Sequence, residues 1–144
     1  NYFKKRYFNH PIYKYNIYGV FEKSNLLSIL VTRTIEYKNS TCMRIVDFYG
    51  DELTLIIHSS NLKKIMYKNN HEYIDFFSKG MDKKLILRAG FRILDIKNKN
   101  LIIPDYFEPF VQTNQQIRFF FDRGVLKNFR FFKGDGDQDR PSII

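Results

Sequence analysis

The chain has 144 residues, 44% hydrophobic and 27% charged, which is enough for one domain with a hydrophobic core and excludes global disorder. Its net charge of +9 favours polyanionic partners, but a composition rich in Lys, Asn and Ile with a single alanine, Ala89, is also what an AT-rich genome encodes. The single cysteine, Cys42, excludes an internal disulfide and favours a cytoplasmic location. No apolar run exceeds four residues, so no membrane span is predicted.

Three strands are predicted in the first third of the chain, because β-branched and aromatic residues dominate there. They occupy residues 12–21, 26–37 and 42–48. The turns between them, 22–25 and 38–41, are short, so the three strands are expected to form an antiparallel meander.

A helix is predicted next, because the apolar residues of 52–70 recur with a period near 3.6 and the pair Asn69–Asn70 stops the pattern. Asp82 is expected to cap a second, short helix that Gly90 ends. This short helix occupies 82–88 and lies between predicted strands at 72–77 and 91–96. A closing hairpin of 117–121 with 128–133 is predicted last. The predicted fold class is α/β with an α+β mixed sheet, covered by helices on its faces.

Two stretches, together with this order of elements, carry a resemblance to a known family. Residues 84–91, KLILRAGF, look like the short helix ending in "xGF" that precedes the sixth strand of GNAT N-acyltransferases. The tail 132–141, FKGDGDQDRP, with VDFYGD at 46–51, looks like uncharacterised GNAT-like proteins of bacterial surface-polysaccharide clusters. The resemblance covers residues 12–144 without the first strand and first two helices of the family. It implies that 1–144 is a single domain from the C-terminal part of a longer chain.

The resemblance implies transfer of an acyl group from acyl-coenzyme A to an amine on an amino sugar or sugar nucleotide in surface-polysaccharide synthesis. Two features of the family are missing. Its Gln/Arg-x-x-Gly-x-Gly/Ala loop cradles the coenzyme A diphosphate, whereas residues 48–55 read FYGDELTL. Ile86 stands where many members have the tyrosine that protonates the leaving thiolate. A non-catalytic binding or scaffold domain with a degenerate GNAT fold is therefore the alternative, and whether the chain is an enzyme stays open.

Carboxylates gather at the end of the third predicted strand, where a mixed sheet opens and accepts ligands. Asp47 and Asp51 are the candidate catalytic bases, and Tyr49 and Glu52 are candidate substrate-binding residues beside them. The alternative is structural, because Asp51 or Glu52 can cap the helix that follows. Asp47 lies in an apolar strand, which leaves a functional and a structural role open for it.

Further substrate-binding candidates lie in the C-terminal third. Tyr106 and Glu108 belong to an aromatic loop, which either walls a sugar cleft or closes the core. The remaining candidates are in the run GDGDQDR: Asp135, Asp137, Asp139 and Arg140. Their spacing does not match a calcium-binding loop, so no metal is expected. The tail is instead predicted to fold back onto the basic body of the domain, where Arg140 binds a carboxylate or phosphate.

The N-terminal segment interleaves basic and aromatic residues, YFKKRYF at 2–8. This pattern suits single-stranded nucleic acid, but no RNA-binding motif accompanies it, so the rings are expected to pack on the sheet. Nucleic-acid binding is therefore the third and least favoured function. His10, His58 and His71 lack the spacing of metal ligands and are expected to be structural.

Overall fold

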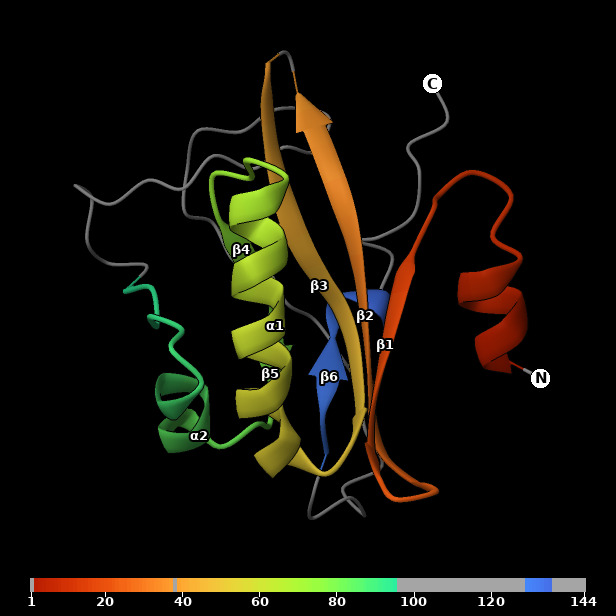
Figure 1. Ribbon diagram of the computed structural model, residues 1–144, viewed down its shortest axis with the longest axis vertical. Helices are drawn as coiled ribbons and strands as arrows, with labels where there is room; N and C mark the ends of the chain where they lie inside the picture. Colours follow the sequence, from red (N-terminus) through yellow and green to blue (C-terminus); the bar gives the residue numbers. More distant parts are fainter. Residues whose placement is uncertain (1, 38, 96–128, 136–144) are drawn as a thin grey trace.

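The computed structural model describes residues 2–37, 39–95 and 129–135 of the chain (Figure 1). These residues form a mixed sheet of four strands in the order β1-β2-β3-β4, a small sheet of β5 with β6, and few helices. The helical elements are η1 (Lys4–Phe8), η2 (Glu52–Thr54), α1 (Leu55–Lys68), α2 (Lys83–Arg88) and η3 (Lys133–Asp135). The strands are β1 (Asn16–Glu22), β2 (Asn25–Tyr37), β3 (Ser40–Gly50), β4 (Ile74–Phe76), β5 (Ser78–Lys79) and β6 (Phe131–Phe132). The expected mixed class of helices and a mixed sheet is confirmed.

The predicted antiparallel meander is present as β1, β2 and β3. Its first turn is shorter than predicted, because β1 ends at Glu22 and β2 begins at Asn25. Lys23 takes a left-handed φ of 53°, which helps two residues to reverse the chain.

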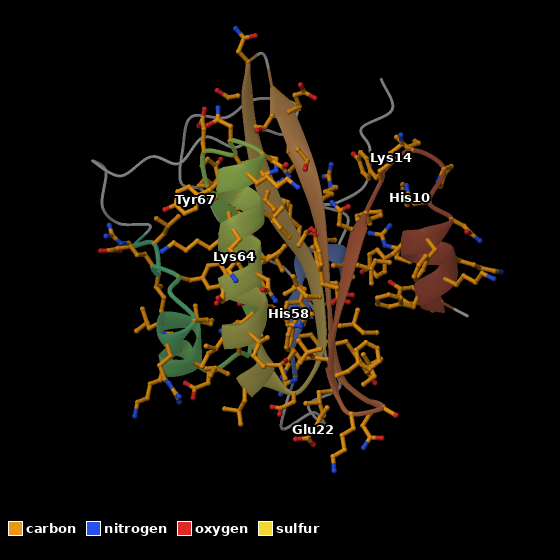
Figure 2. The ribbon with its side chains drawn as sticks, in the orientation of Figure 1. His10, Lys14, Glu22, His58, Lys64 and Tyr67 are labelled. Carbon is orange, nitrogen blue, oxygen red and sulfur yellow. The ribbon has the colours of Figure 1, made fainter. Side chains whose placement is uncertain are left out.

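The first strand also begins later than predicted. Ile12 and Tyr13 donate their backbone N–H groups to Nδ1 of His10, at 3.2 and 2.9 Å, and so form a turn. β1 therefore starts at Asn16 rather than at residue 12. Figure 2 shows His10 on the side of the sheet where η1 lies, and its ring stacks on that of Tyr13, which is a structural role.

A β-bulge in β3 decides which side of the sheet its residues face. The register between β2 and β3 shifts at Val46, which is an extra residue in the ladder. Ile45 and Phe48 consequently belong to the core beneath α1, whereas Val46 and Asp47 contact η1. Strict alternation would have placed Asp47 on the same side as Ile45, in the apolar core.

The two main apolar cores lie on opposite sides of the sheet, one beneath α1 and one beneath η1 (Figure 1), and a small third cluster contains Ile35 and Cys42. In the smaller core Phe3 packs against Tyr7, as expected for the N-terminal segment. The larger core consists of buried side chains from both sheets and both α-helical regions: Leu30, Met43, Ile45, Phe48, Leu55, Leu62, Met81, Ala89 and Phe132.

α1 crosses from β3 to β4 and covers the larger core. The helix predicted at 52–70 consists of the 3-10 turn η2 followed by α1. Leu55, His58 and Leu62 recur three and four residues apart and are buried against the sheet. The helix ends at Lys68 with Asn69 as its C-cap, and Asn70 takes a φ of 55°, so the predicted stop is confirmed.

β3 and β4 are parallel but pair over only three residues, 43–45 with 74–76. The chain then continues into β5, which leaves β3 and pairs with β6 instead. The sequence predicted a partner for 128–133 at 117–121, which lies outside the described residues; the described partner is β5.

Residues 131–135 lie in the opening between β3 and β5. The ring of Phe132 stacks on Phe76 with centroids 6.0 Å apart and meets Phe48 at 6.4 Å. Gly134 packs against Val46, where an added Cβ would lie 3.1 Å from the Val46 carbonyl oxygen. The segment therefore contacts both strands that separate.

The strand predicted at 91–96 is wrong over the part that is described, because 91–95 form no strand. Gly90 takes a φ of 88° after α2, and the Phe91 N–H returns to the Ile86 carbonyl at 3.3 Å. Phe91 then packs on the larger core, 5.7 Å from the ring of Phe76. The alternation of apolar and polar residues in FRILDI is typical of a strand with two different faces. It does not show whether another strand is available to pair with these residues.

A buried ion pair joins β3 to β4. Nε of Arg44 lies 2.9 Å from both carboxylate oxygens of Asp75, and Nη2 lies 2.5 Å from Oδ2. The Arg44 side chain is only 1% exposed. Such a pair holds two strands in register, because each charge is buried and depends on the other for its partner. If one partner is removed, the remaining charge is left buried without a counter-charge or water.

We expect Asp75→Asn to lower the free energy of unfolding by about 3 kcal/mol or more, because it leaves a buried guanidinium beside a neutral amide. Glu52→Gln is the matched control, since its partner Arg130 is 38% exposed, and it should cost about 1 kcal/mol or less. Urea unfolding of both variants measures the difference, and equal costs would contradict a structural role for the Arg44–Asp75 pair.

Candidate functional site

A groove of about 440 Å³ lies at the carboxyl end of β3, between the start of α1 and the short helix α2. The end of β3 and the start of α1 lie at the lower end of the molecule in Figure 1. The lining residues of the groove are Gly50, Asp51, Glu52, Leu53, Asp82, Lys84, Leu85, Arg88 and Arg130. The groove thus contains three carboxylates and three cations, and it is the position where the sequence predicted a site.

The chain turns sharply into the groove at Gly50. This residue has a φ of 112°, and a Cβ there would lie 2.2 Å from the Leu27 carbonyl oxygen, so only glycine fits. The next N–H, of Asp51, bonds to the same carbonyl at 3.0 Å. Oδ1 of Asp51 then accepts the Leu53 N–H at 2.9 Å. Asp51 is therefore a helix cap, as the structural alternative predicted.

Glu52 spans the groove. Its Oε1 lies 2.6 Å from Nε of Arg130, and its Oε2 faces the Asp82 N–H at 3.5 Å. Arg130 also donates through Nη1 to the Gly50 carbonyl at 3.2 Å. These contacts hold Arg130 against η2, which contains Glu52, and against the end of β3 at Gly50. Glu52 also faces Asp82, which precedes α2.

Three groove cations, Lys84, Arg88 and Arg130, were absent from the sequence-based candidates. Lys84 and Arg88 are four residues apart in KLILR, a spacing that places them on one side of a short helix, so this signal was available. Arg130 carried no signal, because its position opposite Glu52 depends on the pairing of β6 with β5.

The residues of the groove do not fit the coenzyme A diphosphate that the family resemblance implies. The Leu53 N–H, which a phosphate at this helix start would use, is bonded to the Asp51 carboxylate. Glu52 adds a second negative charge at the same place, paired with Arg130. Two carboxylates therefore occupy the helix start that a diphosphate would use.

Asp47 does not line the groove, because the bulge turns it towards η1. Its Oδ2 accepts the Tyr7 hydroxyl at 2.6 Å and its Oδ1 accepts the Phe48 N–H at 2.8 Å. Burial raises the pKa of the Asp47 carboxyl, and Asp135 nearby raises it further, against the lowering effect of Tyr7. Burial likewise raises the pKa of the Tyr7 phenol. The two predicted bases, Asp47 and Asp51, thus belong to different sites.

The other predicted site residues are placed as follows. Tyr49 is 74% exposed on β3, and Asp135 uses Oδ2 to accept the Phe132 N–H at 2.8 Å. Arg6 donates to the carbonyl of Gly134 at 3.2 Å, so the start of the tail contacts the body of the domain. The remaining candidates lie outside the described residues: Tyr106, Glu108, Asp137, Asp139 and Arg140.

The histidines and the cysteine have structural surroundings. Figure 2 shows His58 on α1 beside the sheet, where its Nε2 is 2.9 Å from Oγ of Ser28; burial lowers its pKa. Nδ1 of His71 is 2.8 Å from Oγ1 of Thr41. Burial raises the pKa of Cys42 to about 12, so its thiol is a poor nucleophile. Within residues 2–37, 39–95 and 129–135 no cluster of potential metal ligands is found.

No protein-family model matches the chain, and the searches of curated proteins and of solved structures each find no match. In the part of the chain described, no helix has the length and apolar character that crossing a membrane requires. The groove and the Asp47–Tyr7 pair are therefore interpreted from their geometry alone.

We expect the stability of the Asp47→Asn variant, relative to the parent, to rise with pH. The folded-state pKa of Asp47 is raised, so its protonated form stabilises the parent below the unfolded pKa of about 4, and this contribution is lost as pH rises through the folded pKa. Asparagine does not ionise, so the variant does not lose stability in this way as the pH rises. Urea unfolding of both proteins between pH 4 and 8 measures the difference; a difference independent of pH would contradict the buried carboxyl.

Proposed function

We propose that the chain is a GNAT-like domain of bacterial surface-polysaccharide synthesis that binds an amino sugar or sugar nucleotide. The first candidate activity, N-acyl transfer from acyl-coenzyme A, follows from the resemblance of residues 84–91 and of the tail. The second candidate is a non-catalytic binding or scaffold domain whose donor site is degenerate. The contacts of Asp51 and Glu52 favour the second candidate.

The arrangement of elements supports a GNAT-like domain. A three-stranded antiparallel meander leads through α1 into a parallel strand and then α2, in the order that the resemblance implies. The parallel strands separate after three residue pairs, and the groove lies where β3 ends. Ligands of mixed sheets bind at this kind of position. The position of the groove therefore supports the proposal of a binding site where the resemblance implies one.

The two candidates are distinguished by the contacts of the carboxylates that precede α1, Asp51 and Glu52. Asp51 binds the Leu53 N–H and Glu52 binds Arg130, so both the helix donor and the nearest cation are already engaged. Displacing them to admit a diphosphate would cost these contacts and bring like charges together. Of the two predicted bases, only Asp51 faces the groove, and it is held there as a cap.

We expect acetyl-coenzyme A to bind this chain only weakly, with a Kd of about 1 mM or above, because the diphosphate meets Asp51 and Glu52. Isothermal titration calorimetry with acetyl-coenzyme A and, separately, a nucleoside diphosphate sugar measures both ligands. Micromolar binding of acetyl-coenzyme A would contradict the degenerate donor site and support the transferase.

A charge variant sharpens this experiment. Glu52→Gln removes one groove carboxylate and releases Arg130, whereas Glu22→Gln removes a carboxylate from the β1–β2 turn, labelled at the lower end of Figure 2. If the groove carboxylate is the obstacle, Glu52→Gln alone should strengthen binding of acetyl-coenzyme A, by about tenfold for each 1.4 kcal/mol of repulsion removed. Equal effects of the two variants would indicate a response to net charge only.

A further inference from the structure

The basic residues of the chain are unevenly distributed: they cluster on the two α-helices and, on the other side of the sheet, in and after η1. Of the 24 Lys and Arg residues six lie on α1 and α2, and none of the 15 Asp and Glu residues does. Residues 1–21 likewise contain no acid, so the two helices are distinguished by their exposed aliphatic side chains as well as by their cations. The six cations are all exposed: Lys63, Lys64, Lys68, Lys83, Lys84 and Arg88.

Apolar side chains are exposed on the outer side of the same helices. Leu53, Ile57 and Lys64 are four and seven residues apart, a spacing that places them along one side of η2 and α1. Leu53 is 61% exposed and Ile57 51%. Tyr67 is 69% exposed on the outer side of α1, where Figure 2 shows it with Lys64.

α2 continues this surface. Its residue Leu87 is 54% exposed and is flanked in sequence by the cations Lys83, Lys84 and Arg88. Lys84 and Arg88 line the same groove as Leu53, so the outer side of α2 adjoins that of η2 and α1. Both helices lie on the side of the sheet away from η1 (Figure 1). Exposed aliphatic side chains and exposed cations therefore occur together on both helices.

Such a combination matches the chemistry of an anionic lipid surface. Aliphatic side chains insert at the boundary of the acyl chains, while lysine and arginine bind the headgroup charges. Single-stranded nucleic acid would require aromatic rings on which bases stack, and Tyr67 is the one exposed aromatic side chain on α1 and α2. The acids that flank the helices, Asp51 and Asp82, are engaged as helix caps.

We propose that the outer side of η2, α1 and α2 is a peripheral docking surface for a membrane that contains anionic lipid. Its aliphatic residues are Leu53, Ile57 and Leu87, and its cations are those of α1 and α2. The chain would lie on the membrane through this surface without crossing it, and the docking does not depend on the proposed function of the groove.

Vesicle co-sedimentation at physiological salt tests the proposal, with phosphatidylcholine vesicles containing about one-third phosphatidylserine compared with pure phosphatidylcholine vesicles. The full chain should partition onto the anionic vesicles and not onto the neutral ones. Lys64→Glu/Lys68→Glu/Lys83→Glu should lower the partition coefficient at least about tenfold. None of these three lysines lines the groove.

The matched control places the same charge change on the opposite side of the sheet. Lys4→Glu/Lys5→Glu/Lys14→Glu alters exposed residues on and after η1, and Figure 2 shows Lys14 there. This variant should change vesicle binding by less than about threefold. An equal loss in both triple variants, or no binding of the parent to anionic vesicles, would overturn the proposal.

A second variant keeps the net charge and tests the aliphatic contribution. Ile57→Ser/Leu87→Ser should weaken vesicle binding about tenfold and leave binding to an oligo-dT strand unchanged. Because both residues are exposed, the variant remains informative if the charge reversal impairs folding. Tight oligo-dT binding that is lost in the lysine variant, with vesicle binding unaffected by the serine variant, would identify a nucleic-acid surface instead.

Discussion

β3 and β4 pair over only three residues and then separate. The positions of the groove and of the Asp47–Tyr7 pair depend on the segment that lies between the separating strands. An open parallel pair exposes backbone groups and apolar side chains that must find other partners. Residues 131–135 supply these partners, since β6 pairs with β5 and Phe132 enters the larger core. The buried pair of Arg44 with Asp75 fixes where the separation begins.

The same segment connects the two candidate sites. On one side, Arg130 precedes β6 and reaches Glu52 and the Gly50 carbonyl in the groove. On the other side, Gly134 packs beneath Tyr7, where an added Cβ would lie 2.6 Å from the phenolic oxygen. The groove and the Asp47–Tyr7 pair are therefore built on one short element, although they lie on different sides of the sheet. This arrangement explains why the cluster of acids near residue 50 does not form a single catalytic centre.

Local signals in the sequence predicted the local structure. The Asn69–Asn70 stop, the Asp82 cap and the meander depend on backbone preferences of neighbouring residues, and all are present. The bulge at Val46 was not predictable in this way, because one extra residue leaves the apolar pattern of CMRIVDF intact while reversing the side that Asp47 faces. The pairing of β6 with β5 was not predicted, and the strand at 91–96 was wrong over its described part, for one reason. Alternation describes the faces of a strand but not which edge it joins.

The groove lies at the strand end where the sequence predicted a site, and its lining includes the predicted residues Asp51 and Glu52. Asp51 and Glu52 were recognised from their place at a strand end, and Asp51 binds a neighbour in sequence, whereas Glu52 pairs with the distant Arg130. Arg130 meets the Gly50 carbonyl across 80 residues, and Tyr7 meets Asp47 across 40. Contacts of this kind are set by the tertiary fold, so a single sequence carries no pattern for them.

Phe132→Ala tests most directly whether the domain depends on the segment between the separating strands. Phe132 is 4% exposed, and Phe21, which is 61% exposed on β1, is the control. We expect Phe132→Ala to lower the free energy of unfolding by about 3 to 5 kcal/mol in a single cooperative transition, and Phe21→Ala by about 1 kcal/mol or less. Equal small losses in urea unfolding would show that residues 131–135 are dispensable and would contradict this account of the fold and its sites.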